Sequence, residues 1–210
     1  MIPRFPVYLF DVDGTLLNSA ADICGAIRET LSFTDAPSLT DPFLRGYIGH
    51  HLRDMFEDVL PHYGEEKVNE LIVTYRRLYP LRKHASTSVY PGVIEMLQQL
   101  GGRKSTATTK GTEMATNVLR QFGLLQFFDR VQGTDGFPAK PEPDVIVKSI
   151  ESFGVRPEEC LLVGDAAPDM EAGRRAGVKT CAVTYGYGNL EAMRAQQPDY
   201  WIDSPLALIS

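Results

Sequence analysis

Two aspartates stand directly after an apolar run near the start of the chain, in Val7-Tyr8-Leu9-Phe10-Asp11-Val12-Asp13-Gly14. The run has the β-branched and aromatic composition of a buried strand, and open α/β sheets bind their ligands at the carboxyl ends of such strands. Gly14 allows the backbone to bend, so one carboxylate can face a substrate and the other its leaving group. Asp11 and Asp13 therefore suit a nucleophile and a general acid/base, and the simpler alternative is an acidic turn that ends a strand.

A second polar group, Thr108-Thr109-Lys110-Gly111, ends another predicted strand and opens a helix. Hydroxyl and backbone N–H donors that gather at a helix terminus can hold a phosphate. The alternative is that Thr108 is an ordinary strand residue and Lys110 a solvated charge. Both interpretations stay open on this segment alone.

These segments resemble the first two signatures of phosphatases in the haloacid dehalogenase superfamily, DxDGT and a Thr or Ser after the second strand. Two further stretches are similar to the remaining signatures, with Lys140-Pro141-Glu142-Pro143-Asp144 as KPxPD and the stretch from Gly164 to Asp169 as GDxxxD. The resemblance covers nearly the whole chain and is to the phosphoglycolate phosphatase-like members. The chain departs from them at three positions. It has Asn18 where they usually have Asp, Thr109 where they usually have Asn, and Ala166 where they usually have Ser.

The resemblance implies a role for each matched residue. Asp11 would attack phosphorus to form an aspartyl-phosphate, and Asp13 would protonate the leaving oxygen and then activate water. Thr108, Thr109 and Lys140 would bind the phosphate, with the prolines around Lys140 restricting its loop. A surface lysine before a helix is the alternative for Lys140.

The resemblance also implies a metal site. Asp165 would be a magnesium ligand together with Asp11 and the backbone oxygen of Asp13, and Asp169 would support the site by orienting Lys140 or a metal-bound water. Helix capping is the alternative for the last two aspartates. Two like charges about 4 Å apart repel by roughly 4 kcal/mol at an effective dielectric near 20, and one lysine neutralises only one carboxylate. We therefore expect a hard divalent cation with oxygen ligands, Mg²⁺.

Composition excludes several classes of partner. The chain has 210 residues and a formal net charge of -6, without a dense Lys/Arg cluster, which argues against nucleic acid. Cys24, Cys160 and Cys181 lack any zinc or CxxC spacing and are expected to be reduced thiols, which fits the cytoplasm. No apolar run is long enough for a secretory signal or a membrane span. A small phosphorylated substrate is the expected partner, and monomer and homodimer both stay open.

The elements that must position these residues alternate along the chain. Predicted strands cover residues 7–10, 105–108, 160–163 and 180–183. One predicted helix follows Ser19, which has the character of a helix N-cap. Further helices are predicted at residues 43–60, 65–81 and 93–100, and no strand is predicted between 16 and about 87. This pattern indicates an α/β fold with a parallel sheet. The resemblance adds a Rossmann-like core (1–16 and 87–210) in which the Asp11 strand is central and is flanked by the Thr108 and Asp165 strands. It also adds an inserted small all-helical cap (17–86).

The expected cap contains candidates for substrate recognition. Residues 43–56 resemble the cap stretch of phosphoglycolate phosphatases, where Arg45, His50, His51 and Arg53 could offer charge to a substrate carboxylate. Solvated side chains of a helix or loop are the alternative for each. Gly186-Tyr187-Gly188 lacks the third glycine of a dinucleotide fingerprint and is expected to form a loop over the site.

The sequence thus predicts a Mg²⁺-dependent phosphomonoester hydrolase that acts on a small metabolite, with 2-phosphoglycolate as a candidate. A phosphomutase of the β-phosphoglucomutase type would keep the same residues. A phosphate-binding or regulatory protein without turnover is a further alternative. A 2-haloacid dehalogenase would share the fold but lacks the second aspartate of the pair, so Asp13 argues against it.

Overall fold

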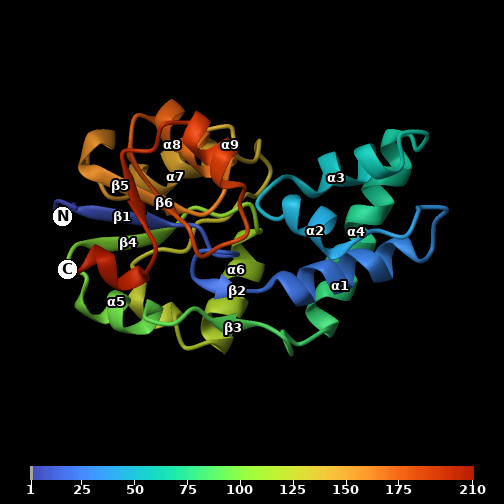
Figure 1. Ribbon diagram of the computed structural model, residues 1–210, viewed down its shortest axis with the longest axis horizontal. Helices are drawn as coiled ribbons and strands as arrows, with labels where there is room; N and C mark the ends of the chain where they lie inside the picture. Colours follow the sequence, from blue (N-terminus) through green and yellow to red (C-terminus); the bar gives the residue numbers. More distant parts are fainter. Residues whose placement is uncertain (1) are drawn as a thin grey trace.

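A computed structural model describes residues 2–210, and its centre is a five-stranded parallel sheet with helices on both faces (Figure 1). The strands lie in the order β4-β1-β5-β6-β7. Their bounds are Val7–Phe10 for β1, Arg103–Thr106 for β4, Cys160–Gly164 for β5, Lys179–Val183 for β6 and Tyr200–Ile202 for β7. The predicted α/β class and the position of β1 between β4 and β5 are confirmed.

The sheet is covered by helices on each face. The helices of this part of the chain are α5 (Val93–Gln99), α6 (Thr112–Gln121), α7 (Asp144–Glu151), α8 (Ala167–Ala176) and α9 (Leu190–Ala195), with short 3₁₀ turns at Leu125–Phe127, Pro157–Glu159 and Pro205–Leu208. Because successive strand residues point to opposite faces, Tyr8 and Phe10 pack in the core with α5 and α6, whereas Val7 and Leu9 pack with α7 and α8. All four side chains are buried, which explains the continuous apolar run.

Strand register brings the polar residues to one edge of the sheet. Phe10 at the end of β1 pairs with Thr106 of β4 on one side and with Val163 of β5 on the other. The residues that follow these strands therefore emerge next to one another. Asp11 and Asp165 are two of them.

Four helices form a separate helical lobe, residues 20–81, beside the sheet (Figure 1). They are α1 (Ala20–Leu31), α2 (Asp41–Gly46), α3 (Leu52–Val59) and α4 (Glu65–Leu81), and they share their own apolar core. The chain enters and leaves the lobe through two short antiparallel strands, β2 (Leu17–Asn18) and β3 (Ser88–Val89). The hydroxyl of Tyr187 accepts the N–H groups of Ser19 and Ala20 at the start of α1, so a core loop holds this connection.

Several predicted boundaries are wrong. The strand expected at 105–108 is β4 and ends at Thr106, because its limits follow its pairing with the four residues of β1. The helix expected at 43–60 is broken into α2 and α3 by a turn that contains Gly49 in a left-handed conformation, with φ at 92°. Strand β2 lies where no strand was expected, since its partner β3 is distant in sequence. Strand β7 was not predicted.

Two observations bear on the environment of the chain. Cys24, Cys160 and Cys181 are buried and form no disulfides. None of the helices within residues 2–210 is both long enough and apolar enough to cross a membrane.

Candidate active site

Three carboxylates converge at the carboxyl edge of the sheet. Asp11 follows β1, Asp165 follows β5, and Asp169 lies in the first turn of α8. Each is at most 3% exposed, and each offers an oxygen within 4.8 Å of those of the other two. The structure therefore brings Asp11 next to Asp165 and Asp169, which lie far from it in the sequence.

Lys140 is the cation at the centre of this group. Its Nζ donates to Oδ1 of Asp11 at 2.9 Å, to the carbonyl oxygen of Ala107 at 2.9 Å, and to Oδ1 of Asp169. Its side chain is fully buried. Burial opposes its charge, but the carboxylates of Asp11 and Asp169 outweigh that effect and raise the pKa of Lys140 above its usual value.

The negative charge at the site exceeds what Lys140 neutralises. Burial is the main reason that the pKa of Asp11 is raised from 3.8 to about 6. Burial, followed by the charges of Asp169 and Asp11, raises the pKa of Asp165 well above its usual range. A hard divalent cation prefers carboxylate oxygens and would relieve this repulsion, so the donor set fits Mg²⁺.

We expect Mg²⁺ to raise the melting temperature of the protein, and to raise it less at about pH 5 than at about pH 7.5. In the ion-free protein Asp11 binds a proton below about pH 6, whereas the unfolded chain binds it only near pH 3.8. The raised pKa therefore makes the ion-free protein more stable as pH falls through this window, while the proton competes with the cation. At a hundredfold excess over its Kd, a ligand adds about 2.7 kcal/mol of stability.

Differential scanning fluorimetry at the two pH values measures this effect. Asp165→Asn is the control and should remove most of the Mg²⁺-dependent shift. Equal shifts at both pH values would contradict a site made of these carboxylates.

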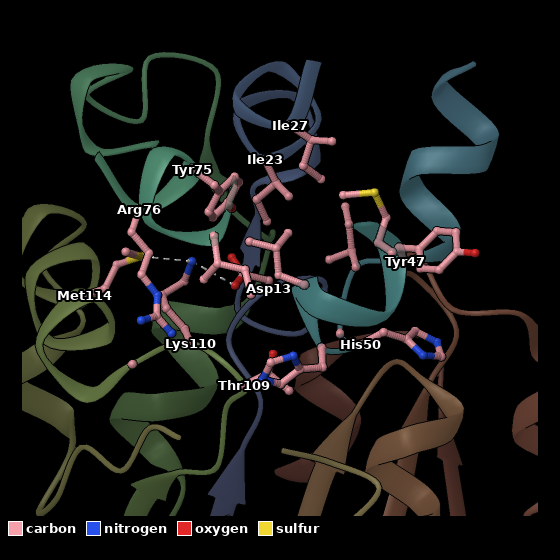
Figure 2. A pocket seen from close by; sticks show the side chains of 17 residues that line it. Asp13, Ile23, Ile27, Tyr47, His50, Tyr75, Arg76, Thr109, Lys110 and Met114 are labelled. Carbon is pink, nitrogen blue, oxygen red and sulfur yellow. Dashed lines mark hydrogen bonds and ion pairs between the residues drawn. The ribbon is translucent and has the colours of Figure 1, made fainter. Parts of the chain in front are cut away.

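Asp13 lies beside Lys110 at a cavity that helices of the lobe also line, and both of its carboxylate oxygens are occupied (Figure 2). Oδ1 accepts a hydrogen bond from the Ser19 hydroxyl at 2.5 Å, and Oδ2 is paired with Lys110 Nζ at 3.2 Å. Ser19 stands at the N-cap position of α1, as predicted, but its side chain makes no capping hydrogen bond and bonds to Asp13 instead. Sequence reasoning missed both contacts.

Asp165 is held by donors from two loops and is tightly enclosed. Thr15 Oγ1 donates to its Oδ1 at 3.2 Å, and the backbone N–H of Tyr187 donates to its Oδ2 at 2.8 Å. A Cβ on Gly14, whose φ is 90°, would lie 2.1 Å from Oδ2 of Asp165, and one on Gly186 would lie 2.3 Å from its Cβ. Only glycine fits at these two positions. The loop of Tyr187 thus contacts the site, as its sequence suggested.

Two of the predicted phosphate-binding residues, Thr108 and Thr109, lie in the loop between β4 and α6. Thr108 is buried, and its hydroxyl accepts the backbone N–H of Lys110 at 3.3 Å. Thr109 lies beside Lys110 and lines a cavity. Helix α6 begins only at Thr112, so this loop, rather than a strand end, carries the hydroxyl and N–H donors.

The cavity lies between the helical lobe and the carboxyl edge of the sheet and has a volume of about 130 Å³ (Figure 2). Asp13, Thr109 and Lys110 form its floor. Apolar side chains form much of its wall: Ile23, Ile27, Met55, Ile72, Tyr75 and Met114. The cavity therefore offers both polar and apolar surface directly beside Asp13.

The charged candidates of the lobe lie in different places. His50 and His51 line the cavity. Arg45 instead lines a neighbouring hollow beside Ala166, and the Arg53 guanidinium pairs with the Glu57 carboxylate at 3.2 Å and the Asn69 side chain at 2.6 Å. Arg76 of α4 lines the cavity and was not predicted, because its helix carries no catalytic signature.

The chain is similar to known proteins over almost its whole length. Residues 8–183 match the profile of a family described as haloacid dehalogenase-like hydrolase. A phosphoglycolate phosphatase of Aquifex aeolicus is 34% identical over 207 residues, which cover 97% of this chain and 94% of that protein. A pyrophosphatase, PpaX, of Halalkalibacterium halodurans is 32% identical over 93% of this chain and 91% of that protein. A haloacid dehalogenase-like hydrolase of Streptococcus pneumoniae superposes with a TM-score of 0.89 at 27% identity, covering 98% and 97% of the two chains.

Proposed function

The chain belongs to the haloacid dehalogenase-like hydrolases, and from this premise we propose that it is a Mg²⁺-dependent phosphomonoester hydrolase acting on a small phosphorylated metabolite. One observation carries the proposal: Asp11, bound by Lys140, shares one edge of the sheet with Asp165, and Asp13 lies beside a cavity. This arrangement supplies a carboxylate nucleophile, charge for a phosphate and a separate acid/base group.

In the proposed reaction Asp11 carries the phosphoryl group. Lys140 binds Oδ1 of Asp11, so we assign the attack on phosphorus to Oδ2. The new O–P bond forms as the ester P–O bond breaks, and Asp13 gives a proton to the departing oxygen. Asp13 then takes a proton from water, which attacks phosphorus and releases inorganic phosphate from Asp11.

Other residues of the site support these two steps. In the proposal, Thr108, Thr109 and Lys140 bind the oxygens of the transferred phosphate. A bound Mg²⁺ would be held by Asp11, Asp165 and the backbone oxygen of Asp13, with Asp169 supporting it, and would supply positive charge to the phosphate. Our proposal also includes residues 17–86 as a cap, whose helical lobe forms the far wall of the cavity and excludes water.

The names of the relatives support two classes of substrate, a phosphate ester and pyrophosphate. We favour a phosphate ester because apolar side chains of the helical lobe, such as Ile23, Ile27 and Met55, line the cavity beside Asp13. Such an apolar wall suits the organic group of an ester. The first ester to test is 2-phosphoglycolate.

A phosphate-release screen tests the proposal. The panel contains 2-phosphoglycolate, other alkyl phosphates, sugar phosphates, aryl phosphates and pyrophosphate. With Mg²⁺ we expect release from at least one ester, and no release above background after chelation. No release from any compound, despite Mg²⁺ binding, would indicate a binding or regulatory protein. Isomerisation of a sugar phosphate without free phosphate, followed by ³¹P NMR, would indicate a phosphomutase.

A further inference from the structure

Lys110 is a buried lysine that no step of the proposed reaction uses. Its side chain is 6% exposed. Its Nζ lies 3.2 Å from Oδ2 of Asp13 and 3.3 Å from the hydroxyl of Tyr79, and 4.4 Å from the centre of the Tyr79 ring. Figure 2 shows the amine between Asp13 and Met114, at the floor of the cavity. The lysine therefore contacts the core through one residue and the helical lobe through another.

A buried lysine needs a reason beyond packing, since an apolar side chain of the same length fills the space without losing hydration. The Asp13 carboxylate, 3.2 Å from Nζ, compensates the buried positive charge, so Lys110 is a charged donor. The hydroxyl and ring face of Tyr79 and the sulfur of Met114, 4.0 Å from Nζ, are its further partners.

Two donors from separate segments fix the orientation of Asp13. Ser19, at the entrance to α1, bonds Oδ1, and Lys110, in the loop before α6, pairs with Oδ2. A carboxylate held at one oxygen can rotate about its side-chain bonds, whereas one held at both has a fixed plane. General acid catalysis requires such a fixed direction toward the leaving oxygen.

We propose that Lys110 is a positioning residue that holds Asp13 in the orientation from which it serves the leaving group, an inference that rests on the proposed function. Lys110 also contacts Tyr79 of α4 in the helical lobe. The orientation of Asp13 therefore depends on the position of the helical lobe relative to the sheet. The proposal gives a role to a contact between the two parts of the molecule.

The inference predicts a dependence on the leaving group. An alkoxide is a poor leaving group and needs the proton of Asp13, whereas a nitrophenolate leaves with little assistance. Loss of Lys110 should therefore slow alkyl esters much more than aryl esters. A residue that only supports the fold would affect both alike.

The test compares Lys110→Met with the wild type on the two esters that the wild type hydrolyses and whose leaving groups differ most in acidity. We expect kcat/KM, which reports the steps up to departure of the leaving group, to fall at least about tenfold on the ester with the poorer leaving group and less than about threefold on the other. A fall in kcat shared by both esters is expected besides, because Asp13 also activates the water of the second step. Lys110→Gln is measured in the same way and carries the test if the Met variant does not fold. The matched control is Lys104→Met, which removes another buried lysine, bonded to the Gly102 carbonyl oxygen far from Asp13, and should leave both rates unchanged.

Other outcomes overturn the inference. Equal falls in kcat/KM on both esters would show a structural role, and falls in kcat/KM that come from a raised KM alone, with kcat unchanged, would show that Lys110 binds substrate directly. Unchanged kinetics would show no role. If the wild type releases phosphate from no ester, the result contradicts the proposed function itself, and the inference about Lys110 loses its basis.

Discussion

Replacing Asp11 by asparagine is expected to lower the turnover of phosphate esters at least about a thousandfold, with the fold intact. An amide is a poor nucleophile, so the covalent step loses its attacking oxygen. Asp11 is almost fully buried directly after β1, and the other carboxylate that Lys140 bonds, Asp169, lies in α8. Steady-state phosphate release at saturating substrate and Mg²⁺ measures the effect.

Stability of the same variant separates chemistry from folding. Asp11 is a buried carboxylate with a raised pKa next to Asp165 and Asp169, so its neutral replacement relieves repulsion in the ion-free protein. The melting temperature without Mg²⁺ should therefore stay near that of the wild type. Asp203→Asn, at an exposed aspartate, is the control and should change neither property. Turnover near the wild-type value would refute the nucleophilic role of Asp11.

Replacing Lys140 by methionine is expected to lower the free energy of unfolding by about 3–5 kcal/mol at about pH 7.5, and to abolish measurable turnover. The methionine fills a similar volume but leaves the buried carboxylates of Asp11, Asp165 and Asp169 without their cation. The loss should be smaller at about pH 5, because Asp11, whose pKa is already about 6 beside Lys140, becomes protonated there. Urea denaturation without Mg²⁺ at both pH values measures it.

Controls for this prediction use the cation itself and another lysine. Added Mg²⁺ should restore part of the lost stability of Lys140→Met, since it supplies positive charge to the same carboxylates. Lys104→Met should show neither the large pH dependence nor the Mg²⁺ response. A destabilisation that is identical at the two pH values would mean that the lysine acts through packing rather than charge.

The parts of the fold that depend on local composition could be predicted from the sequence. The apolar run of β1 and that of β5 are both followed by aspartate, so strand and site residue could be recognised together. The contact of Lys140 with Asp11 spans 129 residues, and no local pattern contains it. Lys140 was expected at the site only through the resemblance to a family.

The remaining contacts escaped because each residue has a simpler local explanation. Ser19 fits a helix cap and Lys110 a solvated charge, but their side chains meet at Asp13. The same holds for β4, whose first residues are Arg103 and Lys104. Their charges suggest a loop, yet pairing with β1 makes them a strand. Tertiary contacts therefore decide the local outcome in these cases.

The pairing of β1 has a consequence for biosynthesis. On the ribosome β1 emerges early, but its two neighbours in the sheet, β4 and β5, are translated only after residues 103 and 160 have been reached. Helices α1–α4 lie between them in sequence and contact one another, so the helical lobe can fold while the nascent chain still lacks a sheet. The apolar strand that precedes Asp11 stays unpaired for that period, and it is the segment that a ribosome-bound chaperone would have to shield.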